Sequence, residues 1–128
     1  MNGYTFARLR GPILVEASAS GPGDSADLRL ILDTGATTTL LNENIVRFLG
    51  LNPDEPASRA NITMTGSIET CPIVTLNRLT AFGQHRLAFP VISHSLPLGS
   101  GIDGLLGLDF LRGHVLTIDF TTGRLSLN

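Results

Sequence analysis

Residues 30–41 read Leu-Ile-Leu-Asp-Thr-Gly-Ala-Thr-Thr-Thr-Leu-Leu. An apolar strand runs directly into Asp33, and Gly35 permits a sharp loop before a second apolar run begins. A carboxylate at the end of a buried strand is expensive to desolvate unless another group pairs with it. Taken alone, Asp-Thr-Gly is most simply a turn in which Asp33 accepts backbone N–H groups, because such tripeptides are common.

A second segment, residues 101–111, reads Gly-Ile-Asp-Gly-Leu-Leu-Gly-Leu-Asp-Phe-Leu. Two bulky apolar residues precede Gly107, and a short helix is expected after that glycine. Alone, this pattern indicates an ordinary corner between a strand and a helix. The pattern becomes informative only together with the first segment, through the order of the two segments and the distance between them along the chain.

The rest of the chain predicts a mostly β protein, because short apolar runs alternate with turn residues. Asn42 is expected to cap a helix over residues 43–49, ended by Gly50, and a second short helix is expected over 109–112. We find no internal repeat of the Asp-Thr-Gly segment. The predicted strands cover residues 5–9, 13–18, 28–32, 62–64, 73–76, 87–92, 115–120 and 124–127.

Length and composition favour one domain spanning residues 1–128. The chain has 128 residues, of which 42% are hydrophobic and 16% charged. That low share of charge leaves apolar surface to cover, which favours self-association. All nine basic residues are arginines, scattered singly from Arg8 to Arg124. The absence of a basic stripe argues against nucleic-acid binding.

The sequence predicts neither a metal site nor a cofactor. Cys71 is the single cysteine, and it is interpreted as a small apolar residue in a strand. His85, His94 and His114 are 9 and 20 residues apart, which is no ligand spacing. The N-terminus lacks the apolar stretch of a signal peptide, and no run is long enough to span a membrane. A cytoplasmic protein, or a soluble domain of a longer one, is expected.

Together the two segments resemble those of the retroviral-type, or retropepsin-like, aspartic proteases, and most closely the bacterial single-domain members. In that family an Asp-Thr-Gly-Ala loop is followed, about seventy residues later, by an apolar–apolar–Gly element that packs beneath it. Residues 33–36 match the first element, and Leu105-Leu106-Gly107 matches the second. The resemblance covers residues 13–127 and implies a closed or partly open β-barrel that forms a homodimer.

The resemblance also implies the site residues. Asp33 is the expected catalytic residue, with Thr34 and Gly35 supporting the active-site loop. A flap hairpin is expected at about residues 61–76, with Thr65 and Gly66 at its tip. The expected substrate-binding residues are Ala36, Thr65, Gly66, Ile68, Ile102 and Leu105.

Aspartic proteases generally use two carboxylates that share one proton, because two like charges this close cannot both ionise. The chain carries one Asp-Thr-Gly, so the second carboxylate is expected from Asp33 of another copy. Retroviral enzymes often carry an ion pair where this chain has Thr37 and Leu108, and that support for a dimer is absent here. Their last strand helps to build the dimer, and the resemblance implies the same role for one or both terminal strands of this chain. The expected function is cleavage of an extended peptide or unfolded protein. A catalytically silent dimerisation or peptide-binding module is the alternative.

Overall fold

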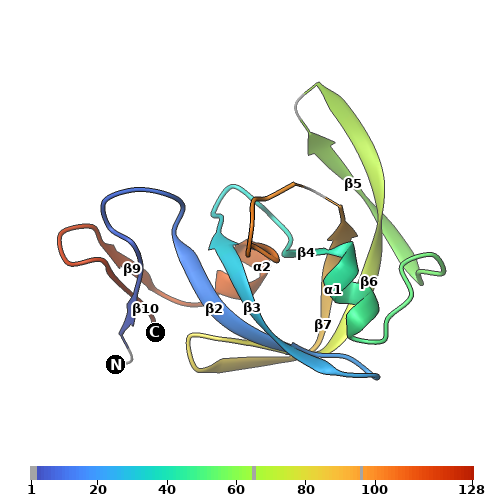
Figure 1. Ribbon diagram of the computed structural model, residues 1–128, viewed down its shortest axis with the longest axis horizontal. Helices are drawn as coiled ribbons and strands as arrows, with labels where there is room; N and C mark the ends of the chain where they lie inside the picture. The colour runs from blue at the N-terminus through green and yellow to red at the C-terminus, as the bar shows by residue number, and fades with distance from the viewer. Residues whose placement is uncertain (1–2, 65, 96) are drawn as a thin grey trace.

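The computed structural model describes residues 3–64, 66–95 and 97–128 (Figure 1). The prediction of a mostly β fold with two short helices is confirmed. Along the chain the elements are β1 (Tyr4–Thr5), β2 (Leu14–Ser20), β3 (Ser25–Leu32), β4 (Leu40–Asn42), α1 (Glu43–Phe48), β5 (Ser58–Met64), β6 (Ser67–Ala81), β7 (Gln84–His94), β8 (Gly104–Leu106), α2 (Leu108–Leu111), β9 (Leu116–Asp119) and β10 (Arg124–Leu127).

Six strands close into a barrel in the order β2-β3-β8-β4-β7-β6, because β6 also pairs with β2. Strand β5 pairs only with the outer part of β6, and this β5–β6 hairpin rises away from the barrel at the upper right of Figure 1. A second sheet, in the order β1-β10-β9, joins the two ends of the chain. It lies beside the barrel at the left of the same view.

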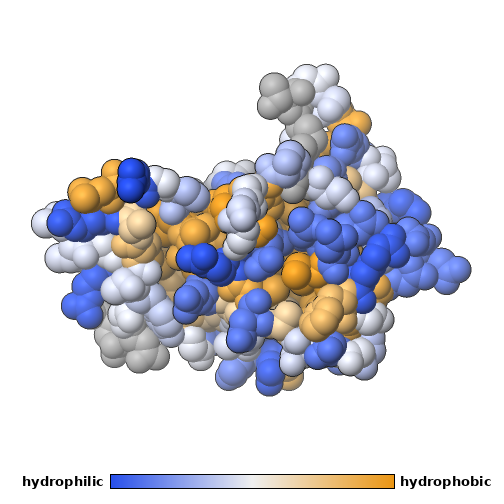
Figure 2. All heavy atoms as spheres, viewed as in Figure 1, coloured by the Kyte–Doolittle hydropathy of each residue, from blue (hydrophilic) through white to orange (hydrophobic). Residues whose placement is uncertain are grey.

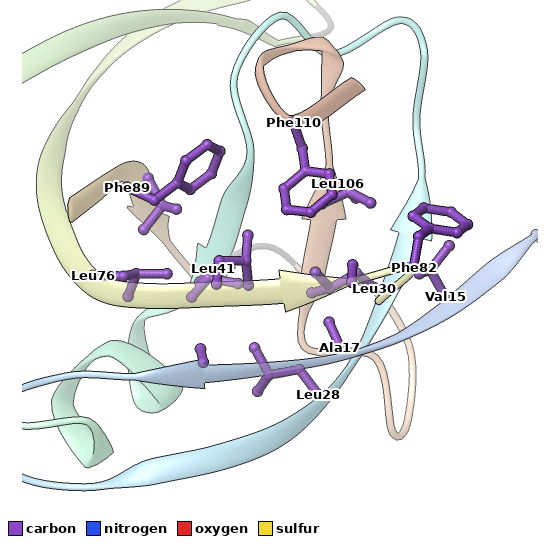
Figure 3. Close-up of a cluster of buried hydrophobic side chains, with 14 of the residues drawn as sticks. Val15, Ala17, Leu28, Leu30, Leu41, Leu76, Phe82, Phe89, Leu106 and Phe110 are labelled. Atoms are coloured by element: carbon purple, nitrogen blue, oxygen red, sulfur yellow. The ribbon is translucent and has the colours of Figure 1, made fainter. Parts of the chain in front are cut away.

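The barrel interior is filled by side chains that alternate along the strands. In β3, Leu28 and Leu30 are buried while Arg29 between them is exposed, as expected when successive side chains point to opposite faces. Figure 3 shows side chains from separate strands and from α2 meeting in this core. The fully buried residues of this core include Leu30, Leu41, Leu76, Leu106 and Phe110.

Strand β8 holds the two parts of the barrel together. It runs parallel to β3, with Leu30 opposite Gly104, and antiparallel to β4, with Leu40 opposite Leu105. A Cβ on Gly104 would collide with the carbonyl oxygen of Leu40, so this close crossing requires glycine. The segment between β3 and β4, which carries Asp33, is therefore held at both of its ends by β8.

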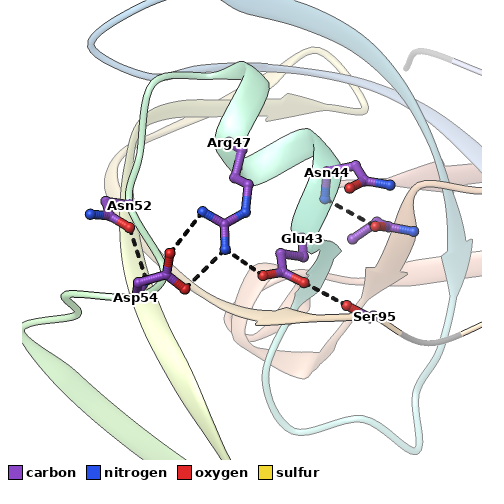
Figure 4. A network of polar contacts seen from close by, with 7 residues as sticks. Glu43, Asn44, Arg47, Asn52, Asp54 and Ser95 are labelled. Atoms are coloured by element: carbon purple, nitrogen blue, oxygen red, sulfur yellow. Dashed lines mark hydrogen bonds and ion pairs between the residues drawn. The ribbon is translucent and has the colours of Figure 1, made fainter.

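Helix α1 begins as the sequence predicts, because the side chain of Asn42 accepts the backbone N–H of Asn44 at 3.1 Å. Gly50 follows the helix with a φ of 88°. The guanidinium of Arg47 donates hydrogen bonds to Glu43 at 2.7 Å and to both carboxylate oxygens of Asp54 at 2.9 and 3.0 Å (Figure 4). This network attaches the helix to the loop that leads into β5.

Three expectations about the strands need correction. The strand predicted over residues 5–9 is limited to Tyr4–Thr5, and Leu9 is 81% exposed, because the chain bends away before it can pair further. Strands β4 and β8 were not predicted, since three-residue strands show no periodicity. The runs 73–76 and 87–92 are the inner parts of the much longer β6 and β7.

In the described part of the chain, none of the helices has the length and hydropathy to cross a membrane.

Candidate active site

Asp33 follows β3 directly, and its position is set by hydrogen bonds. Its backbone N–H donates to the carbonyl of Leu106 in β8 at 3.0 Å, and its own carbonyl accepts the N–H of Ala36 at 3.1 Å. The carboxylate Oδ1 accepts the backbone N–H of Gly35 at 2.9 Å. A Cβ on Gly35 would lie 3.1 Å from that oxygen, so glycine leaves room for the carboxylate. Thr34 beside it is exposed.

The loop after Asp33 rests on the beginning of α2. The N–H of Leu108 donates to the carbonyl of Ala36 at 2.8 Å, and the N–H of Asp109 donates to that of Thr37 at 3.2 Å. A Cβ on Gly107 would come within 2.8 Å of the carbonyl oxygen of Ala36, so a side chain there would displace the Asp33 loop away from α2. The prediction that the 105–107 element packs beneath the Asp33 loop therefore agrees with these contacts.

Thr39 and Asp109, a pair that the sequence analysis missed, support the same loop. Thr39 is fully buried, and its hydroxyl donates to Asp109 Oδ1 at 2.7 Å while accepting the N–H of Gly107 at 3.1 Å. Its backbone N–H donates to Asp109 Oδ2 at 2.9 Å. Asp109 therefore acts as an anchor between the two sequence segments. The available signal was a polar residue, Thr39, immediately before a buried Leu-Leu pair.

A cleft of about 430 Å³ lies between this loop and strand β5. Figure 2 shows apolar surface in the hollow beside the projecting hairpin. The lining brings together four residues predicted for the site, Asp33, Gly35, Ala36 and Leu105, and adds several that were not predicted. The added residues are Thr37, Thr38, Leu40, Asn61, Ile62, Thr63 and Ile92.

The remaining predicted residues lie elsewhere. Gly66 is exposed at the turn of the β5–β6 hairpin with a φ of 79°, and Ile68 on β6 is 70% exposed. Ile102 is half-buried in the loop before β8. Thr65 lies outside the described residues. The structure of this single chain thus assembles the floor of the predicted site, and the hairpin stands open beside it.

Other carboxylates near these elements have structural partners. Asp103 Oδ2 accepts the N–H of Arg29 at 2.9 Å. Asp119 Oδ1 accepts the N–H groups of Thr122 and Thr121, and these two bonds hold the pKa of Asp119 below its usual range. Within the described part of the chain, Asp33 is the one carboxylate that lines the cleft. The described part of the chain therefore brings a single carboxylate to the cleft.

The structure also brings together Cys71 and His94, which the sequence analysis treated separately, and adds Glu69, which it did not consider. Glu69, Cys71 and His94 place possible ligand atoms within 4.8 Å of one another, at the junction of the hairpin and the barrel. Their separation along the chain gave no ligand spacing, so only the pairing of strands could bring them together. None of the three lines the Asp33 cleft itself.

The closed barrel, the Asp-Thr-Gly loop at the end of β3 and the strand β8 beneath it define a retropepsin-like aspartic protease fold. A family model described as aspartyl protease matches residues 15–110, and the chain belongs to this family. The fold is similar to the crystal structure of a retropepsin-like aspartic protease from Rickettsia conorii, with a TM-score of 0.74 and 21% sequence identity, over 99% of this chain and 90% of that one. A search of curated protein sequences gives no significant match.

Proposed function

We propose that the protein is an aspartic endopeptidase whose active site contains Asp33 from each of two identical subunits. The observation that supports this most strongly is the setting of Asp33. Its carboxylate is oriented by Gly35 and lies in a cleft between a rigid loop and a projecting hairpin. Because a lone carboxylate cannot act as base and acid at once, a second copy is needed to complete the chemistry.

In this proposal the two carboxylates share one proton. The ionised one takes a proton from water as the water attacks the peptide carbonyl, and the protonated one donates a hydrogen bond to the carbonyl oxygen. The pair titrates as a unit, so neither Asp33 has a pKa of its own. Thr34 is proposed to support the partner's loop, which fits its exposed position.

The substrate is proposed to be an extended peptide between the loop and the hairpin. Ala36 and Leu105 line the cleft floor and Ile62 lines its hairpin side, so apolar side chains flank the reacting carbonyl. Strand-like binding suits a cleft bordered by β5. We propose that Gly66, Ile68 and Ile102, which do not line the cleft in the single chain, approach the substrate when the hairpin closes and the dimer forms.

The sheet β1-β10-β9 is the proposed site of dimerisation. Strands β1 and β9 are its two edges, and an edge strand presents backbone groups that can pair with another chain. Val115 and Phe120, which flank β9, are 66% and 63% exposed. Covering these side chains would add apolar burial to the backbone pairing.

The test replaces the carboxylate by an amide. Asp33→Asn is expected to lower cleavage of an unfolded substrate by about 1000-fold or more, because the variant lacks a base for the attacking water. Cleavage would be measured by peptide mass analysis between about pH 4 and pH 7, with and without pepstatin. Asp27→Asn is the matched control, since Asp27 is exposed on the same strand, roughly 20 Å away.

Cleavage that persists unchanged in Asp33→Asn would contradict the proposal. A wild-type protein that binds peptides and dimerises but cleaves none of them would instead indicate a silent peptide-binding module.

A further inference from the structure

Three side chains with metal-binding atoms meet where the β5–β6 hairpin joins the barrel. Glu69 and Cys71 are two residues apart on β6, so their side chains leave the same face of the strand. The register that pairs Ile73 with Ile92 puts Cys71 opposite His94 when it is continued by two residues on each strand. Strand pairing thus assembles a thiol, an imidazole and a carboxylate.

The distances fit a small ion. The possible ligand atoms of the three residues lie within 4.8 Å of one another, and His94 Nε2 is 2.6 Å from Glu69 Oε2. Around a tetrahedral zinc ion, neighbouring ligand atoms lie roughly 3.3 to 3.5 Å apart. An ion between Nε2 and Oε2 therefore requires these two atoms to move apart by roughly 0.7 to 0.9 Å. The side chain of Glu69 can move by this distance, because it is 50% exposed.

Two buried polar atoms beside the cluster lack hydrogen-bond partners among the described residues. They are His94 Nδ1 and Ser93 Oγ, and Ser93 is only 3% exposed. Both residues line a cavity of about 430 Å³ together with Glu69 and Cys71. Buried polar atoms are nearly always satisfied, so unpaired ones mark places where a water or an ion belongs. With the ion bound to Nε2, the ring proton lies on Nδ1, and a water in the cavity is its expected acceptor.

We propose that Glu69, Cys71 and one ring nitrogen of His94 bind a divalent transition-metal ion of the zinc type, with water from the cavity as the fourth ligand. The mixed sulfur, nitrogen and oxygen donors select such an ion over Mg²⁺ and Ca²⁺, which prefer oxygen alone. Binding releases the thiol proton to solvent, so that a thiolate coordinates the ion.

Without a metal ion, the cluster contains no reactive nucleophile. Burial, and then the nearby charge of Glu69, raises the pKa of the Cys71 thiol, so the thiol stays protonated at neutral pH and is no nucleophile. A bound ion would tie the hairpin strand β6 to the end of β7. Glu69 also pairs with Ile62, which lines the Asp33 cleft, so the ion would steady the wall of that cleft.

The experiment titrates Co²⁺, and then Zn²⁺ in competition, into the full chain after chelator treatment. The Asp33→Asn background prevents self-cleavage. Because Cys71 is the single cysteine, a thiolate-to-cobalt charge-transfer band can arise from no other residue. We expect this band together with visible bands of tetrahedral Co²⁺, their loss on adding Zn²⁺, and a rise in Tm with Zn²⁺.

Glu69→Gln and His94→Gln are expected to weaken Zn²⁺ binding at least ~10-fold, since even changes outside the ligand shell cost ~10–100-fold. Cys71→Ser should abolish the charge-transfer band, with circular dichroism checking that the variant folds. His85→Gln is the matched control, because His85 is an exposed histidine on the same strand β7, and it should bind like the parent. Absence of the band, or unchanged affinity in Glu69→Gln and His94→Gln, would overturn the proposal.

Discussion

At the scale of single residues, the important property of Asp33 is how firmly it is held. Its N–H, its carbonyl and its carboxylate all take part in hydrogen bonds, two of which stay inside the Asp33–Ala36 loop. Such bonds fix the direction of the carboxylate before any substrate arrives, and this reduces the reorganisation needed during catalysis. The loop in turn depends on Thr39 and Asp109, which are not proposed to touch substrate.

Thr39→Val tests this dependence. Valine has nearly the same shape, but it removes the hydroxyl that joins Asp109 to the N–H of Gly107. We expect the free energy of unfolding to fall by about 2 kcal/mol, because the buried N–H of Gly107 loses its acceptor, while Asp109 Oδ1 keeps the N–H of Phe110. Proteolytic activity should fall as well, since the Asp33 loop loses its support.

Thr39→Ser is the matched control, because it keeps the hydroxyl and removes one methyl group, worth about 1 kcal/mol. Urea denaturation would give both values. Equal losses in the two variants would show that the packing of Thr39 matters and its hydrogen bonds do not.

At the scale of elements, α1 and the loop after it depend on charge. Hydrogen bonds from Ser95 and then Arg47 lower the pKa of Glu43, and the bonds from Arg47 lower that of Asp54 (Figure 4). A lowered pKa means that the carboxylate stabilises the fold above its ordinary pKa, and that this contribution is lost as the pH falls through the folded value. The contribution of Asp54 to the stability of the fold is thus lost as the pH falls below 3.8, the ordinary pKa of an aspartate, and through the lower pKa that this group has in the folded protein.

Arg47→Gln should therefore destabilise the protein at neutral pH and matter less in acid. The urea midpoint of the variant would lie below that of the wild type at pH 6, and the gap should narrow as the pH falls below 3.8 and Asp54 becomes protonated. Denaturation curves across this range would show the convergence. A gap of constant size would mean that Arg47 acts through its packing instead of its charge.

At the scale of the whole molecule, one chain forms a complete barrel and, in the proposed mechanism, half of an active site. The barrel is closed within a single chain by the β2–β6 pairing. The cleft, in contrast, contains one carboxylate from the described chain, and the edges of the terminal sheet remain available for pairing. The proposed dimer therefore joins chains that are already folded.

Mixing wild type with Asp33→Asn tests the shared active site. In an equal mixture with free subunit exchange, about one quarter of the dimers keep two Asp33 carboxylates. The activity should fall to about one quarter of that of wild type at the same total concentration, as followed with a fluorogenic peptide. A fall to only about one half would show that each chain acts alone, which contradicts the proposal.

Much of the fold could be predicted from the sequence because its signals are local. Short apolar runs bounded by turn residues indicated the strands at the centres of β2, β3, β6 and β7, and Asn42 indicated the start of α1. The short strands β4 and β8 gave no periodic signal, and the N-terminal strand was predicted too long, because its length depends on what it pairs with. For the site, the lining residues contributed by β5 could not be predicted, since they depend on where the hairpin stands.

By itself, the sequence determined a mostly β chain with one Asp-Thr-Gly loop, because strand character and turn chemistry depend on neighbouring residues. Only the tertiary structure decided that β8 lies between β3 and β4, that Thr39 binds Asp109, and that Glu69, Cys71 and His94 meet. Each of these depends on the register between strands far apart in the chain. That register is set by the packing of the whole core, which no local pattern encodes.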